Sequence, residues 1–248
     1  MPNLIWNDEF NGPTGAPPDV LKWTANIGGD GWGNQELEYY TDNKNAYQDG
    51  QGHLVVEARQ ESPAGLQCWN GPCKYTSARL TTADRMSFTH GRVEARIKIP
   101  YGQGLWPAFW LLGSNCGPVE WPACGELDIM ENIGKEPNII HATMHGQGYS
   151  GGNGISGTYT MANGHYSDNY HIYAIEWDSN HAAFFVDGAN YLNVTRAQVE
   201  AKGQWVFDHA FNVVLNIAVG GGWSGNPDGN TVFPQKMYVD YVRLFQLG

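Results

Sequence analysis

Basic residues are scarce in this chain of 248 residues, and charged residues of both signs make up only 16% of it. The 14 Lys and Arg residues are outnumbered by 25 Asp and Glu residues, which gives a formal net charge of −11. Nucleic acids and anionic membrane surfaces attract proteins through cationic patches. The sequence also lacks an apolar run as long as a membrane-spanning helix requires. We therefore expect no nucleic acid, membrane or other polyanion as a partner.

Glycine and aromatic residues are abundant instead. The chain holds 32 Gly and 10 Trp, and aromatic residues reach 13%. This composition suits a β-rich fold with many tight turns and argues against most helical architectures. The segment from Arg92 to Ile99 shows the matching pattern, because Val93, Ala95 and Ile97 share one face of an extended chain and the charged residues share the other. Such alternation predicts a half-buried strand.

Six further segments show strand-type patterns, and Ser179-Asn180 and Asp187-Gly188 are placed as hairpin turns between two of them. A single short helix is expected, over residues 195–202. Strands at this spacing, without helices between them, predict an all-β fold, an antiparallel β-sandwich of jelly-roll type. Without a linker or internal repeat, residues 1–248 are expected to form one domain. The six segments are residues 53–59, 139–145, 171–177, 182–186, 211–219 and 237–245.

The four cysteines form two close pairs, Cys68 with Cys73 and Cys116 with Cys124, and both pairs bracket Pro and Gly. An even count inside polar turns predicts two short-loop disulfides in an exported protein. The alternative is a zinc site, which normally uses tighter C-x-x-C spacing. If the disulfides form, we expect a secreted protein whose leader has been removed. The segment Asn193-Val-Thr195 would accept a glycan only in a eukaryotic host.

Three carboxylates lie within six residues in the segment from Gly125 to Asn132. Plain strand alternation puts Glu126 and Asp128 on one face and Glu131 on the other, but a β-bulge near Ile129-Met130 would return Glu131 to the first face. Carboxyls held this close repel one another, and a pair whose pKa values are pushed apart supplies both a nucleophile and a proton donor. The alternatives are a solvated strand face or a calcium site.

The chain resembles glycoside hydrolase family 16, and within it the bacterial laminarinase-like endo-1,3-β-glucanases. The resemblance runs from Trp6 to Arg243, and its most specific motif is the bulged acid segment from Glu126 to Glu131. It implies a jelly roll whose concave face is crossed by a β-glucan, and retaining hydrolysis without a catalytic cofactor. The other motifs lie at residues 90–96, 104–112, 141–146 and 216–221.

The resemblance also implies roles for single residues. Glu126 would be the nucleophile, Glu131 the general acid/base, and Asp128 would tune the protonation and position of the nucleophile. Asn34 and Arg79 resemble residues that contact glucose hydroxyls, and His145 resembles a histidine near the catalytic carboxylates. A hydrogen-bonded sheet histidine is an equally good interpretation of His145. A structural calcium site on the convex side would use Glu9, Gly52 and Asp240.

Tryptophans are candidates for the sugar platforms of such a cleft, because sugar rings present apolar C–H faces. Trp106 and Trp110 are four residues apart, which places both on one face of a strand, and their position in the motif favours the cleft over the core. Trp121 and Trp223 lie in Gly/Pro-rich loops and are assigned to the cleft rim. Trp6 and Trp177 are instead assigned to the core.

Retaining chemistry needs two carboxyls about 5 to 5.5 Å apart, which residues on one face of a bulged strand could provide. Glu126 must be ionised to attack, and Glu131 must carry a proton, which the negative charges of Glu126 and Asp128 favour. The expected substrate is 1,3-β-glucan, with mixed-linkage 1,3-1,4-β-glucan as the alternative, and a monomer is expected. A non-catalytic glucan-binding module is a further alternative.

Two other patterns in the sequence would indicate different functions, dinucleotide binding and serine hydrolysis. Residues 146–151 and 220–225 match the dinucleotide-binding fingerprint, but neither opens a helix within a βαβ unit. Residues 148–152 fit the nucleophile elbow of serine hydrolases, but the strand-to-helix context is absent. We therefore interpret both patterns as loops.

Overall fold

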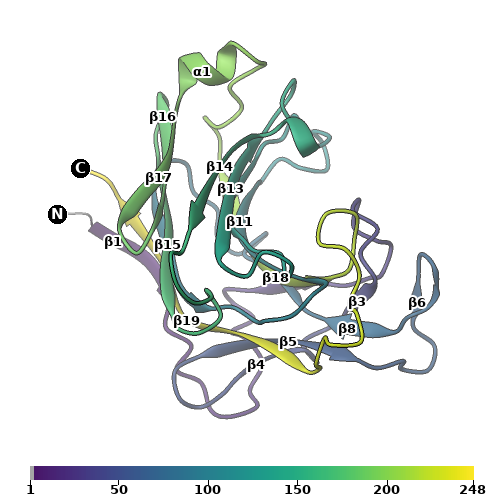
Figure 1. Ribbon diagram of the computed structural model, residues 1–248. Coiled ribbons are helices and arrows are strands. Elements are labelled where there is room, and N and C mark those ends of the chain that lie inside the picture. The colour runs from purple at the N-terminus through teal and green to yellow at the C-terminus, as the bar shows by residue number, and fades with distance from the viewer. Residues whose placement is uncertain (1–2) are drawn as a thin grey trace.

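The computed structural model describes residues 3–248, and its strands form two large sheets packed face to face (Figure 1). The described strand pairs are antiparallel except for β3 with β8, which run parallel. The predicted antiparallel sandwich of jelly-roll type is therefore confirmed. The first, ten-stranded sheet runs in the order β17 (Ala189–Thr195), β16 (His181–Val186), β15 (His171–Trp177), β10 (Gly91–Lys98), β19 (Gln235–Gln246), β5 (Leu54–Gln60), β8 (Tyr75–Ser77) and β3 (Glu38–Tyr40), with β1 (Asn3–Asp8) beside β19 and β4 (Ala46–Gln48) beside β5.

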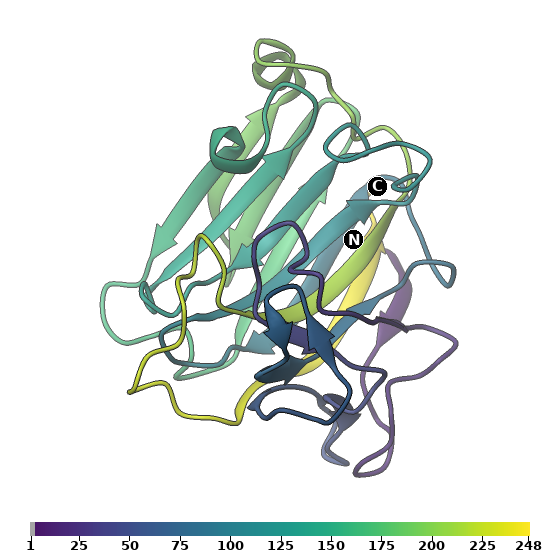
Figure 2. The same ribbon diagram turned by 90° about the vertical axis from the view of Figure 1, so that its right-hand side faces the viewer.

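The second sheet has seven strands and carries the concave face, which Figure 2 shows from the front. It runs in the order β14 (Ile155–Thr160), β13 (Ile139–His145), β12 (Glu126–Glu131), β11 (Leu105–Gly113), β18 (Phe211–Val219), β9 (Arg79–Thr81) and β2 (Thr24–Asn26). A separate two-stranded hairpin, β6 (Gln67–Cys68) with β7 (Gly71–Pro72), projects beside it.

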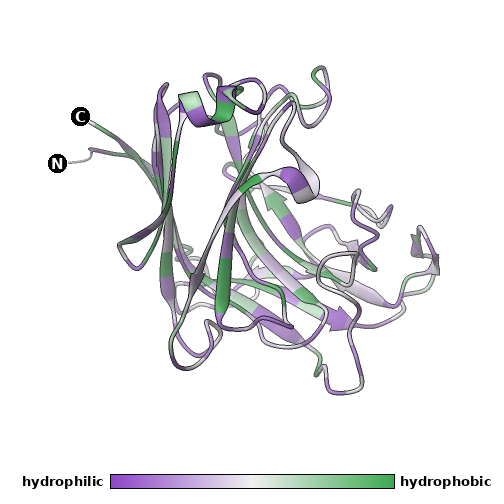
Figure 3. Cartoon of the chain, turned by 45° about the horizontal axis from the view of Figure 1, so that its top comes forward, coloured by the Kyte–Doolittle hydropathy of each residue, from purple (hydrophilic) through white to green (hydrophobic). Residues whose placement is uncertain are grey.

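The space between the sheets is filled by one cluster of buried apolar side chains, to which strands of both sheets contribute. Figure 3 shows hydrophobic segments along the facing strands. The alternation expected in β10 is observed, with Val93, Ala95 and Ile97 buried. Strand β18 is buried along its whole length, because one face joins this core and the other forms the floor of the concave side. Trp177 is fully buried, as predicted, whereas Trp6 is only half-buried at the edge of the core.

The disulfides and the short helix, which depend only on residues close to each other in the sequence, are present as predicted. Both disulfides are present, Cys68–Cys73 and Cys116–Cys124, so the cysteines do not form a zinc site. The helix α1 spans Arg196–Glu200 and begins at Thr195, whose side chain forms a capping box with Gln198. No described helix is long and apolar enough to cross a membrane.

The two rival glycine patterns lie in loops, as interpreted. The segment with the elbow-like Ser150 joins the antiparallel strands β13 and β14 through a short 3₁₀ turn, η1 (Gly151–Asn153). The pattern at 220–225 follows β18 without opening a helix. A nucleophile elbow requires a strand-to-helix turn of an α/β sheet, and neither segment supplies one.

The expected calcium site is not supported by its side chains. Both carboxylate oxygens of Glu9 accept hydrogen bonds from Arg243, at 2.8 Å each. The Oδ2 atom of Asp240 is 2.6 Å from the guanidinium of Arg96. Two arginines therefore already neutralise the carboxylates that a hard cation would need, so these side chains do not fit a calcium site in this arrangement.

Candidate active site

Strand β12 carries the three carboxylates on the concave face because it is bulged where predicted. Phe109 and Trp110 of β11 pair with Met130 and Asp128, so Ile129 is the extra residue. The register on the β13 side shifts at the same place. Ile129 and Met130 both turn into the core, which brings Glu131 back to the face of Glu126 and Asp128.

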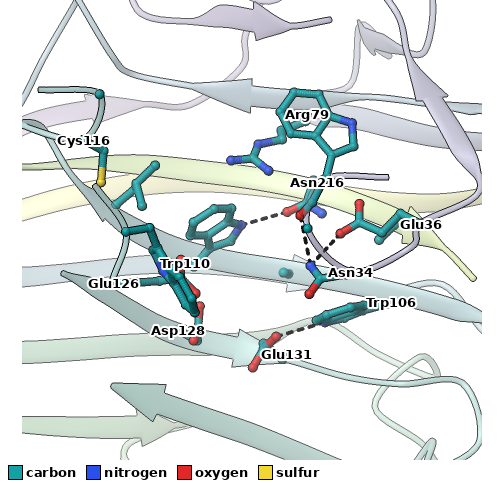
Figure 4. A pocket seen from close by; sticks show the side chains of 17 residues that line it. Asn34, Glu36, Arg79, Trp106, Trp110, Cys116, Glu126, Asp128, Glu131 and Asn216 are labelled. Carbon is teal, nitrogen blue, oxygen red and sulfur yellow. Dashed lines mark hydrogen bonds between the residues drawn. The ribbon is translucent and has the colours of Figure 1, made fainter. Parts of the chain in front are cut away.

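The three carboxyls line a cleft of about 460 Å³, within the range of small-molecule sites. Figure 4 shows them in a row along β12. Asp128 is only 4% exposed and Glu131 only 8% exposed, so the solvated-face alternative for this segment is wrong.

Burial raises the pKa of all three carboxyls, because it disfavours their charged forms. The pKa of Glu131 is raised well above its ordinary value by burial and by the charges of Asp128 and Glu126. Burial, followed by the charge of Asp128, raises the pKa of Glu126 to about 8. The pKa of Asp128 is raised to about 8 by burial. The charges of His145 and Arg79 and the hydrogen bond from Trp121 partly offset the rise in the pKa of Glu126, as the hydrogen bond from Trp106 and the charge of His145 do at Glu131.

Two tryptophans hold the outer carboxyls in place. Trp106 Nε1 donates to Glu131 Oε1 at 3.0 Å, a contact drawn in Figure 4. Trp121, on the loop closed by the second disulfide, donates from Nε1 to Glu126 Oε2, also at 3.0 Å. Both residues line the cleft, as predicted. Each indole N–H therefore fixes one oxygen of one carboxyl and leaves the other oxygen free to react.

His145 lies next to the carboxylates, opposite Glu126 in the register of β12 and β13. Its Nε2 atom is 3.1 Å from Asp128 Oδ2 and 3.8 Å from Glu126 Oε1. It is not among the residues that line the cleft itself, and it sits behind Trp121, with ring centroids 5.9 Å apart. We therefore assign it to the support of the acid row and not to direct sugar contact.

The opposite wall of the cleft is built around Arg79. Its guanidinium lies between the rings of Trp32 and Trp110, 4.6 and 4.7 Å from their centroids. Trp110 Nε1 donates to Asn216 Oδ1 at 2.8 Å (Figure 4). These two cation–π contacts, with the hydrogen bond from Arg79 Nε to Asn26 Oδ1 at 3.2 Å, hold the guanidinium at the cleft wall.

The family of the chain follows from comparison with known proteins. The model of glycosyl hydrolases family 16 matches residues 32–243. The chain belongs to glycosyl hydrolases family 16. A beta-glucanase from Rhodothermus marinus is 39% identical over 98% of this chain and 85% of its own length. A glucan endo-1,3-beta-glucosidase A1 from Niallia circulans is 36% identical over 98% of this chain, which spans only 38% of that relative.

A solved structure agrees with this assignment. The endo-beta-1,3-glucanase from Pyrococcus furiosus is 48% identical and superposes with a TM-score of 0.92, covering 99% of this chain and 94% of that chain. The chain is therefore a glycoside hydrolase with the fold that the sequence predicted, and the enzyme class is confirmed.

The hydrogen bonds around Asn34 involve three residues that were not predicted from the sequence, namely Glu36, Tyr40 and Asn216. Asn34, which was predicted, donates from Nδ2 to Glu36 Oε1 at 2.9 Å, and the hydroxyl of Tyr40 donates to Glu36 Oε2 at 3.0 Å. Asn216 in turn donates to that hydroxyl at 3.1 Å. A chain of hydrogen bonds, buried from Glu36 inward, thus links the exposed Asn34 on one loop to Trp110 on β11. The available signal was the pair Asn212 and Asn216 inside the otherwise apolar run of β18.

Trp223, predicted at the cleft rim, lies next to the cleft-lining Trp106 but is not itself among the residues that line the cleft. Its ring packs edge-on against Trp106, with centroids 5.1 Å apart, and against His141 at 4.9 Å. Its loop is held by Lys135, whose Nζ donates to the Trp223 carbonyl at 2.7 Å. Trp223 therefore supports Trp106, which in turn holds Glu131.

The disulfide-closed hairpin of β6 and β7 braces the loop that carries Asn34. Trp69, at its tip, is 50% exposed, yet its Nε1 donates to the Glu36 carbonyl at 2.6 Å and its backbone N–H donates to the Gly29 carbonyl at 2.7 Å. A Cβ atom on Gly31 would lie 2.9 Å from the indole ring, so only glycine permits this close packing. The hairpin thus positions the cleft loop.

Proposed function

We propose that this family 16 hydrolase is an endo-1,3-β-glucanase that cleaves internal bonds of laminarin-type glucans with retention of anomeric configuration. The observation that carries the proposal is the row of carboxyls on bulged β12, with Glu126 and Glu131 each held by a tryptophan at the floor of an open cleft. The names of the relatives, a beta-glucanase and two endo-1,3-β-glucanases, support the substrate class.

In the first step, a carboxylate oxygen of Glu126 attacks the anomeric carbon and forms a glycosyl ester. The bond from this carbon to the glycosidic oxygen breaks, and Glu131 gives its proton to that oxygen as the leaving sugar departs. The raised pKa of Glu131 supports its role as the proton donor, because burial and the adjacent charges of Asp128 and Glu126 favour its protonated form.

In the second step, Glu131 is a carboxylate and takes a proton from water, whose oxygen attacks the anomeric carbon. The ester bond to Glu126 breaks, and the nucleophile is regenerated as a carboxylate. Esterification removes the negative charge of Glu126, which lowers the pKa of Glu131 and favours its change from acid to base.

The cleft walls support a neutral sugar as the substrate. Indole faces from Trp110 and Trp32 lie beside the amide of Asn34 and the guanidinium of Arg79, a combination that suits the apolar faces and hydroxyl rims of glucose. The net charge of −11 disfavours sulfated galactans.

The product ladders from laminarin, curdlan and barley β-glucan test this proposal. We expect laminarin and curdlan to yield short oligosaccharides with new reducing ends, and barley β-glucan to be cleaved more slowly. Equal or faster cleavage of the barley substrate would favour the mixed-linkage alternative. Binding to laminarin without any release of reducing ends would favour the glucan-binding module.

We also propose that the protein is exported. Both disulfides support this, because such bonds persist in oxidising compartments and are rare in the reducing cytosol. Fractionation of producing cells tests it, and finding the protein in the cytosol with free thiols would contradict it.

Replacing Trp121 with Phe should shift the pH profile of the hydrolase. The indole N–H stabilises ionised Glu126, so its loss raises the pKa of this carboxyl further. Since attack requires the ionised form, the acid limb of kcat/KM on laminarin should move to higher pH, by less than about one unit for a half-exposed hydrogen bond. An acid limb that stays in place would show that Trp121 does not hold the nucleophile.

Replacing Trp69 with Phe should weaken substrate binding without slowing bond cleavage. The change removes the donor to the Glu36 carbonyl, a contribution of about 1 kcal/mol, so we expect KM for laminarin to rise about fivefold at constant kcat. Asn70→Ala on the same hairpin is the matched control. A fall in kcat at constant KM would contradict a role in positioning the binding loop.

A further inference from the structure

The acid row and His145 together place three metal-binding side chains around one point. One donor atom each from Glu126, Asp128 and His145 lies within 4.8 Å of the other two, and no other group of three such donors occurs among residues 3–248. We propose that these three residues form a site for Zn²⁺, and that the bound ion inhibits the hydrolase reversibly by taking the nucleophile as a ligand.

The spacing of the donors fits zinc. Zn²⁺ binds nitrogen and oxygen at about 2.0 to 2.2 Å in tetrahedral geometry, which puts neighbouring ligand atoms about 3.3 to 3.5 Å apart. The His145 Nε2 atom is 3.1 Å from Asp128 Oδ2 and 3.8 Å from Glu126 Oε1, so the two separations bracket this value. Small side-chain adjustments would complete a three-ligand site, with the fourth position open to the cleft.

An unpartnered buried oxygen points to the same place. Asp128 Oδ2 is buried and accepts no hydrogen bond, although His145 Nε2 is close to it. At Glu126, Trp121 occupies Oε2, which leaves Oε1, the atom that faces His145. A divalent cation would coordinate both free oxygens at once.

The donor set also indicates which cation binds and how strongly. Imidazole with two carboxylates suits Zn²⁺, whereas Mg²⁺ and Ca²⁺ require six or more oxygen ligands. A resident zinc site normally lets the second nitrogen of its histidine donate to an acceptor, but His145 Nδ1 is buried without a partner. This missing support indicates a reversible inhibitory site and not a permanent structural one.

Calorimetric titration of the purified protein with ZnCl₂, without substrate, tests the proposal. We expect one Zn²⁺ per chain, no binding of Mg²⁺, and binding at least about tenfold weaker in His145→Gln. The matched control is His181→Gln, which removes a histidine paired with Asp178 on an exposed hairpin at 2.9 Å and should leave Zn²⁺ binding and activity unchanged. Equal affinity in wild type and His145→Gln would overturn the proposal.

Two measurements on the wild type keep the test independent of how the variant folds. A laminarin oligosaccharide bound in the cleft should weaken Zn²⁺ binding, and EDTA should restore activity lost to Zn²⁺. Zinc binding that the oligosaccharide does not affect would place the ion elsewhere and contradict the site. A chain that binds Zn²⁺ as described but cleaves no glucan would contradict only the proposed function.

Discussion

Replacing Glu126 with Ala should lower kcat on laminarin by at least about 10³-fold, because the proposed mechanism forms the glycosyl ester on this carboxylate. Glu131 keeps its hydrogen bond from Trp106 and can still protonate the leaving sugar. Added azide should therefore restore part of the rate by entering the space of the missing carboxylate. Since it attacks from the face of the nucleophile, the product should be the α-glycosyl azide, which carbon-13 and proton NMR identify.

The anomer of that product is the critical result. A β-glycosyl azide from Glu126→Ala would show that azide replaced water and not the nucleophile, and the two glutamates would exchange roles. Ordinary activity in Glu126→Ala without azide would remove the double-displacement mechanism altogether. Glu120→Ala is a suitable control, since this acidic residue lies in the disulfide-closed loop before β12 and outside the cleft lining.

Replacing Glu131 with Gln should lower kcat on laminarin by about 10² to 10⁴-fold, the usual contribution of a general acid. The amide preserves the size of the side chain and can still accept from Trp106 Nε1, so the cleft geometry is retained. It can donate no proton to the leaving sugar. A substrate with a dinitrophenyl leaving group needs no such proton, so its first step should remain close to the wild-type rate.

The pH profile gives a second, independent readout of this variant. In the wild type, kcat/KM should fall at high pH as Glu131 loses its proton, and its raised pKa places that limb well above the range of an ordinary carboxyl. In Glu131→Gln the alkaline limb should disappear while the acid limb, set by Glu126, remains. Retention of the alkaline limb would assign it to another group.

Much of the active strand could be predicted from the sequence because its information is local. Alternation places Glu126 and Asp128 on one face, and the spacing to Glu131 requires one extra residue, which the structure places at Ile129. The short disulfide loops and the capped helix at Thr195 are local in the same sense, since their partners lie within eight residues of each other.

The rest of the cleft joins residues that are distant in the chain. The hydrogen bond from Asn216 to Tyr40 spans 176 positions, and the contact from Trp69 to the Glu36 carbonyl links two loops 33 positions apart. No periodicity in either segment indicates its partner. The same holds for the arginines that pair with Glu9 and Asp240, the carboxylates that the sequence assigned to calcium.

The sequence by itself determined the strand-rich class, the disulfide partners and the common face of three carboxyls, because side-chain direction and short-loop closure depend only on neighbours in the chain. Only the tertiary structure decided which tryptophan holds which carboxyl, that Arg79 contacts two indoles, and that Trp223 packs against Trp106. These contacts depend on which strands lie side by side, and that order is set by the packing of two whole sheets around one core.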